Sequence, residues 1–194
     1  MTRFTLTALA GTALGVASAA HATVTANTYE IRVSNVVSPS QPSTTVEVYA
    51  AWDSDLFYAF AGNEWSLRGD TTGDFSGPAS AFTDPGQIDG TPVGGDVTDI
   101  VTGQLQFPSA GIFADTSDPI LIWSATWSTS DFTARFVDLN TETDRYQLYL
   151  DDTGLSSDVT TTVLEAAGRI EVIPAPASLA LLALGGLTAI RRRR

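Results

Sequence analysis

The chain has 194 residues, which is room for one domain of ordinary size and two short targeting segments. It contains no cysteine, which excludes disulfides, thiolate metal sites and a cysteine nucleophile from this sequence. All 22 acidic residues lie between Glu30 and Glu171, together with only five arginines, so this middle part has a net charge of −17 that disfavours nucleic acids and anionic membranes as partners.

Residues 1–22 have the composition of a secretory signal peptide. One basic residue, Arg3, precedes a small, apolar run over residues 4–20, and Ala20 and Ala22 then supply the small residues of a cleavage site. The pattern predicts a signal helix that signal peptidase removes, so that the mature protein begins at Thr23. An amphipathic first helix of the folded domain is the alternative, which the run disfavours because it has no polar face beyond scattered threonines.

Residues 23–173 are expected to form one acidic, extracellular all-β domain. Their apolar residues come in short runs of β-branched and aromatic side chains that alternate with polar ones, and no long stretch has a helical period. Residues 69–95 are rich in glycine and proline and are expected to be an irregular loop, and one short helical turn is expected over 97–102. Strands are predicted over 29–33, 46–52, 56–61 and 65–68.

The second half of this domain contains the strongest predicted strand, residues 120–127. A hairpin is expected next, with strands over 132–139 and 145–150 joined by a polar turn, and a last strand is expected over 169–173. Strands at this spacing without crossover helices predict an antiparallel β-sandwich of the jelly-roll or immunoglobulin-like kind. The expected fold class is therefore all-β, flanked by the N-terminal signal helix and a short C-terminal hydrophobic helix.

Residues 174–194 contain three features in order: a proline motif, 14 uncharged and mostly apolar residues over 177–190, and an arginine cluster. At about 1.5 Å per residue the apolar run would be about 21 Å long as a helix, shorter than a bilayer core of about 30 Å, so it is a marginal membrane anchor. The arginines are expected to stay on the cytoplasmic side and leave residues 23–173 outside. The motif is Pro174, Ala175 and Pro176, and the cluster is Arg191, Arg192, Arg193 and Arg194.

This order resembles the PEP-CTERM family of sorting signals, and the resemblance covers residues 174–194 only. It implies that an exosortase-type membrane enzyme recognises and processes the segment during export, often in Gram-negative bacteria that make exopolysaccharide. The family's usual glutamate between the prolines is Ala175 here, so the motif is a variant one. An ordinary short tail anchor that is never processed is the alternative.

Aromatic side chains are the first candidates for a ligand site, because carbohydrate-binding proteins stack sugars on tryptophan and tyrosine. Trp52 and Tyr58 flank an acidic turn and are candidates for an exposed platform, although core positions are favoured for both. Trp123 and Trp127 lie four residues apart on one strand, so they share a face that is expected to be core. Further core stripes are expected at Phe132, Ala134 and Phe136 and at Tyr146, Leu148 and Leu150.

An acidic ladder in the predicted polar turn is a candidate calcium site. Oxygen-bearing side chains stand at every second position, and calcium takes six to eight oxygen ligands. The sequence lacks the central glycine and the last glutamate of an EF-hand loop, so solvated turn residues are the favoured interpretation. The candidate calcium ligands are Asp138, Asn140, Glu142 and Asp144.

The composition removes most enzyme mechanisms from residues 23–173. With no Lys or Cys in the sequence and its single His at position 21, a His-based triad, histidine zinc ligands and a Lys Schiff base are excluded there, and no catalytic residue is assigned. The leading hypothesis is an exported, surface-sorted, non-catalytic protein of the cell envelope or extracellular matrix of a Gram-negative-type bacterium, with signal peptidase and an exosortase-type enzyme as processing partners. Membrane insertion through the C-terminal helix is expected to be transient.

Two other functions remain open for the same domain. One is a carbohydrate-binding module or adhesin that recognises exopolysaccharide. The other is a polysaccharide-active hydrolase, which would need two carboxylates in a suitable arrangement. The sequence contains many carboxylates, but none lies in a recognisable catalytic motif.

Overall fold

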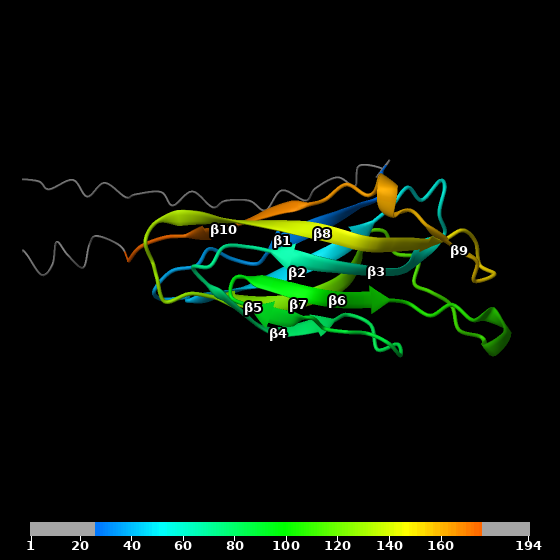
Figure 1. The fold of residues 1–194 in the computed structure, drawn as a ribbon, viewed down its shortest axis with the longest axis horizontal. Helices are drawn as coiled ribbons and strands as arrows, with labels where there is room; N and C mark the ends of the chain where they lie inside the picture. Colours follow the sequence, from blue (N-terminus) through cyan, green and yellow to red (C-terminus); the bar gives the residue numbers. More distant parts are fainter. Residues whose placement is uncertain (1–25, 176–194) are drawn as a thin grey trace, which may run out of the picture.

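The computed structural model describes residues 26–175, which form a β-sandwich (Figure 1). Residues 1–25 and 176–194 lie outside the described part. The predicted signal peptide with its cleavage site, Pro176, the apolar run over 177–190 and the terminal arginine cluster therefore all fall outside the described residues.

Ten strands in the described part form two antiparallel sheets. One has the order β1-β2-β7-β4, and the other has the order β10-β8-β3-β6-β5, with β9 paired to β8. Two 3-10 helices, η1 (Pro108–Ala110) and η2 (Thr160–Thr162), lie in loops. The predicted all-β antiparallel sandwich is confirmed. The strands are β1 (Thr28–Val33), β2 (Ser43–Ala51), β3 (Ala59–Arg68), β4 (Asp74–Ser80), β5 (Thr91–Val93), β6 (Asp96–Gly103), β7 (Ile120–Ser128), β8 (Arg135–Tyr149), β9 (Ser156–Asp158) and β10 (Ala167–Val172).

The core lies between the two sheets and is rich in tryptophan. Val48 of β2 pairs in register with Trp123 of β7, and both side chains are fully buried because alternate residues of a strand face the same side. The indole of Trp123 lies edge-on to that of Trp65 in the opposite sheet, with ring centroids 5.6 Å apart. Trp127 is also fully buried, so the prediction that Trp123 and Trp127 belong to the core is confirmed.

The hairpin predicted over 132–150 is wrong. Strand β8 runs without a turn from Arg135 to Tyr149, with β3 on one side and β10 and β9 on the other. Thr141, which was expected in the turn, lies in the middle of this strand and is buried. Its hydroxyl donates to Glu165 Oε2 at 2.6 Å and accepts from the N–H of Ala166 at 2.9 Å. These partners stabilise an inward-facing polar side chain within the sheet.

The segment 97–102, expected as a helical turn, is part of strand β6. Asp99 has a positive φ of 59°, and the register with β3 shifts between Trp65 and Leu67. This bulge lets Val97 and Ile100 both face the core although they are three residues apart, a spacing that imitates a helix.

Two further expected boundaries differ from the structure. The two short strands predicted over 56–61 and 65–68 are one strand, β3, and residues 56–58 belong to the turn before it. The expected loop over 69–95 contains strands β4 and β5. β4 is an edge strand whose pairing with β7 is interrupted between Ser76 and Ala79, around Gly77 and Pro78, which explains its loop-like composition.

The predicted aromatic core stripes are only partly correct. Tyr146 and Leu148 are fully buried, as expected. Phe136 is 58% exposed on the outer side of β8, and the guanidinium of Arg169 lies 5.0 Å from its ring centroid. The remaining exposed positions among those predicted as core are Ala134 and Leu150, and Phe132 is half-buried at the border of the core.

Aspartates close many of the loops. In five places one carboxylate oxygen accepts both the N–H and the hydroxyl hydrogen of a Ser or Thr two residues further on. This Asx turn needs the short side chain of Asp, which contributes to the excess of 16 Asp over 6 Glu. The pairs are Asp70 with Thr72, Asp115 with Ser117, Asp131 with Thr133, Asp151 with Thr153 and Asp158 with Thr160.

The two ends of the sandwich carry different segments. Val172, the last residue of β10, pairs with Arg135, the first residue of β8, so the chain leaves β10 at the end where β8 begins. The loops after β6 and β8 lie at the opposite end (Figure 1). Neither helix in residues 26–175 has the length and apolar character needed to cross a membrane.

Candidate functional site

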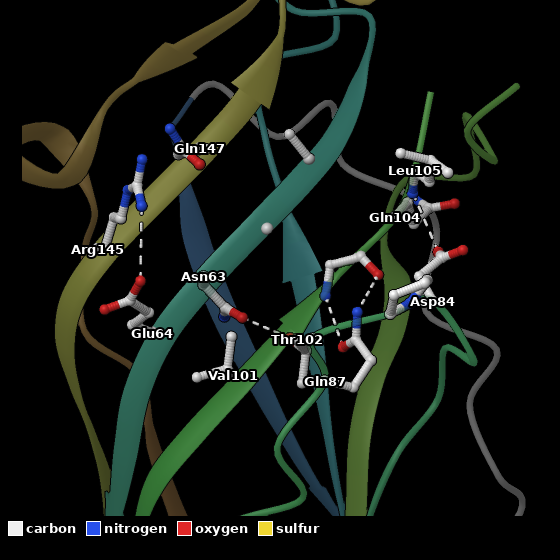
Figure 2. Close-up of a pocket in the computed structure, with 15 residues that line it drawn as sticks. Asn63, Glu64, Asp84, Gln87, Val101, Thr102, Gln104, Leu105, Arg145 and Gln147 are labelled. Atoms are coloured by element: carbon white, nitrogen blue, oxygen red, sulfur yellow. Dashed lines mark hydrogen bonds and ion pairs between the residues drawn. The ribbon is translucent and has the colours of Figure 1, made fainter. Parts of the chain in front are cut away.

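A groove of about 310 Å³ opens on the outer side of the six-stranded sheet (Figure 2). Strands β8, β3 and β6 form its base, and the loop over residues 84–87 forms one wall. Its lining is rich in amide and charged side chains, and none of the lining residues is aromatic. The groove lies toward the end of the sheet that carries the loops after β6 and β8, because Gln147 and Gly103 are both near the last residues of their strands.

Two facing glycines form part of the base of the groove. Gly62 of β3 and Gly103 of β6 are partners in the ladder. A Cβ on Gly103 would lie 2.7 Å from the carbonyl oxygen of Ala61, so a side chain there would force the two strands apart. The pair therefore keeps the strands close together and leaves this part of the base without side chains.

The loop wall of the groove is held by hydrogen bonds to the neighbouring strand. The Gln87 amide donates to the carbonyl of Gly103 at 2.9 Å and accepts from the N–H of the same residue at 3.0 Å. The hydroxyl of Ser80 donates to the Gln87 side chain at 3.1 Å, and Asp84 Oδ2 accepts from the N–H of Leu105 at 3.0 Å. The contacts of Gln87 with Gly103 and of Asp84 with Leu105, drawn as dashed lines in Figure 2, hold the wall against the neighbouring strand.

The opposite side of the groove carries polar groups that are available for binding. Arg145 of β8 forms an ion pair with Glu64 of β3 at 3.5 Å, and both side chains are about half exposed. The side chain of Gln147 is half-buried and forms no hydrogen bond to any residue between 26 and 175. Its amide therefore offers both a donor and an acceptor to a ligand.

A buried polar network lies directly beneath the groove. The Asn63 amide donates to the Tyr29 hydroxyl at 3.1 Å, and the hydroxyl of Thr102 donates to the Asn63 carbonyl. The Thr143 hydroxyl also donates to Tyr29 at 3.3 Å. Burial raises the pKa of Tyr29, although the hydrogen bonds from Thr143 and Asn63 oppose the rise. Because the tyrosine stays neutral at physiological pH, the network links the two sheets without placing a charge in the core.

The aromatic platform suggested by the sequence does not form at Trp52. Its side chain has no exposed surface and packs in the core, which is incompatible with stacking on a sugar. Tyr58 is half-buried and lines a second, shallower hollow beside Leu56, Leu150 and Asp151, in the loops at the end of the sandwich. The structure therefore does not bring Trp52 and Tyr58 together on a common surface.

The four candidate calcium ligands lie along one exposed side of β8. Asp138 is paired with Arg169 at 2.6 Å and Glu142 with Arg68 at 2.6 Å, whereas Asn140 and Asp144 are exposed between and beyond them. Residues 26–175 contain no group of three or more acidic or histidine side chains arranged to hold a metal ion. The structure does not gather the ladder into a cage, and calcium binding stays a prediction from the sequence.

The groove residues come from three separate stretches of the chain, around positions 62–64, 84–87 and 145–147. None of them forms a motif, so sequence analysis missed them. The one available signal was a glycine inside a strand pattern, which often marks a close approach of two backbones. Chemically, the groove offers hydrogen bonds, the ion pair of Arg145 with Glu64 and the carboxylate of Asp84.

No protein-family model matches this chain, and no curated protein matches it in sequence. Among solved structures, the chain is similar to a cohesin module from Clostridium perfringens ATCC13124 family 33 glycoside hydrolase, with a TM-score of 0.51 and 9% sequence identity. The match covers 78% of this chain and 100% of that module. At this identity the likeness shows the β-sandwich fold alone.

Proposed function

We propose that this chain is an exported, surface-sorted, non-catalytic protein of the cell envelope or extracellular matrix. The order of features over residues 174–194 carries the proposal: the proline motif, the apolar run and the arginine cluster together have the layout of a PEP-CTERM sorting segment. Signal peptidase and an exosortase-type enzyme would process the two terminal segments in a Gram-negative-type bacterium.

Two features of the folded part support this assignment. Strand β10 ends at Val172, two residues before Pro174, so the proposed sorting motif would follow the sandwich directly. The groove lies toward the end of the sheet away from this exit. A domain tethered through residue 174 would therefore present its groove away from the membrane.

The mass and location of the protein in its native host test the proposal. We expect protein recovered from the envelope or medium to begin at Thr23 and, if processed, to lack the arginine cluster. Replacing Pro174 and Pro176 together with alanine is expected to impair processing, whereas Pro42→Ala, in an exposed loop, is the matched control. Intact cytoplasmic protein that retains residues 1–22 would refute the proposal.

A second candidate function is a carbohydrate-binding module or adhesin for exopolysaccharide. The groove favours it, because its amide and charged side chains can form hydrogen bonds with the hydroxyl groups of a ligand. This function is compatible with surface display.

A further inference from the structure

We propose that the groove between β8, β3, β6 and residues 84–87 binds an uncharged, hydroxyl-rich sugar chain. This inference rests on the proposed surface display, since such a ligand would be met outside the cell. The groove takes the place of the aromatic platform as the candidate ligand site, because the burial of Trp52 excludes that platform.

The hydrogen-bonding capacity of the groove defines the class of ligand. Arg145 can only donate hydrogen bonds, the carboxylate of Glu64 can only accept them, and the amide of Gln147 does both. An ammonium ligand could not satisfy the donors, and a carboxylate or sulfate ligand could not satisfy Glu64. A hydroxyl group both donates and accepts, so neighbouring hydroxyls of a sugar can satisfy all three side chains.

The electrostatic field points to the same class. Glu64 and Asp84 outnumber Arg145 in the lining, and the net charge over residues 26–175 is −17. Each of the five arginines in this part of the chain is already in an ion pair, so none provides an isolated positive charge for an anionic chain. Uronate-rich or sulfated polysaccharides are therefore expected to be repelled.

The shape of the groove sets the expected affinity. Its volume of about 310 Å³ is at the small end of the range for ligand pockets, room for about one or two sugar units. The wall is already ordered by Gln87 and Asp84, so little ordering is needed on binding. Without an aromatic ring for stacking, each site is expected to bind weakly, with a Kd on the order of 0.1–1 mM.

The test is a calorimetric titration of the purified full-length protein with neutral oligosaccharides of glucose, mannose and galactose. Oligogalacturonate and glucosamine oligomers serve as the anionic and cationic comparisons. The groove variants are Gln147→Met, which keeps the size of the side chain, and Glu64→Gln, which removes one charge. Gln41→Met, in an exposed loop at the far end of the sandwich, is the matched control.

We expect at least one neutral series to bind, with affinity reduced about tenfold or more by Gln147→Met and unchanged by Gln41→Met. Circular dichroism melts of each variant would separate a loss of binding from a loss of folding. The proposal is overturned if no neutral oligosaccharide binds at about 10 mM, if only a charged series binds, or if both groove variants bind as well as the control. Any of these results would leave surface display intact, because that function is tested by mass and location.

Discussion

Replacing Asn140 with proline is expected to destabilise the sandwich by about 2–6 kcal/mol. Asn140 lies in β8, where it pairs with Arg68 of β3 on one side and with Ala167 of β10 on the other. The N–H of Thr141 donates to Ala166 on the β10 side, so the N–H of Asn140 faces β3. Proline removes this donor from the interior of a sheet and leaves its acceptor unpaired.

The loss of stability comes from the backbone alone. The Asn140 side chain is exposed, so replacing it changes the buried apolar area very little. An unpaired buried carbonyl costs about 1–3 kcal/mol, and the fixed ring adds steric strain of similar size. Against a typical total stability of about 5–15 kcal/mol, such a loss is large.

Urea unfolding followed by tryptophan fluorescence measures this loss, because the four tryptophans are buried in the core. Asn140→Thr is the control, since it keeps the N–H and suits a strand. A difference of less than about 0.5 kcal/mol between the two variants would refute the continuous β8, because a proline at an exposed turn position costs little.

Three further substitutions test other parts of the structure. Trp123→Phe is expected to lower the free energy of unfolding in urea by about 0.5–1.5 kcal/mol more than Trp65→Phe does. The indole N–H of Trp123 donates to the Asp89 carbonyl at 2.8 Å, whereas that of Trp65 has no partner between residues 26 and 175. Equal losses in the two variants would contradict this. Asp118→Asn is expected to raise Tm at pH 7 but not at about pH 3. Desolvation, with a smaller contribution from Asp53, raises the pKa of Asp118, so its ionised form destabilises the folded state at pH 7, whereas at about pH 3 the carboxyl group is protonated and has no such effect. A lower Tm of the variant at pH 7 would contradict this. Asp151→Glu is expected to lower Tm at pH 7 while the neighbouring Asp152→Glu does not, because only Asp151 accepts the hydrogen bonds of Thr153. These bonds lower the pKa of Asp151, so the difference in Tm should fade as the pH falls below the pKa of an ordinary carboxyl group. Equal melting temperatures of the two variants at pH 7 would count against the turn.

The parts of the fold that follow from the sequence are those whose inward residues are all apolar. β7 was predicted because an apolar run from Ile120 to Trp123 is followed by alternating polar and apolar residues up to Trp127. β3 and β8 were each predicted as two shorter strands, because a buried polar residue, Asn63 in β3 and Thr141 in β8, interrupts the apolar pattern. Their partners lie far along the chain: Tyr29 for Asn63 and Glu165 for Thr141. A local pattern cannot reveal that such a residue is satisfied inside the sheet.

The candidate groove could not be predicted for a related reason. Glu64 and Arg145 are far apart in sequence and meet only because β3 and β8 are neighbours in register. Gln87 belongs to a stretch that was expected to be loop, and its role depends on the backbone of Gly103. The sequence offered the more conspicuous tryptophans as ligand candidates, but large aromatic side chains are also the ones that the core of a small sandwich needs most.

The acidity of the domain also has a structural origin that its composition does not reveal. Ten of the 16 aspartates accept a hydrogen bond from a main-chain N–H, mostly in loops, where the short carboxylate satisfies backbone donors that no strand can reach. Much of the net charge of −17 is thus tied to loop closure and is spread over the surface. A field spread in this way is expected to repel anionic partners, in line with the proposal that the groove binds uncharged, hydroxyl-rich groups through hydrogen bonds.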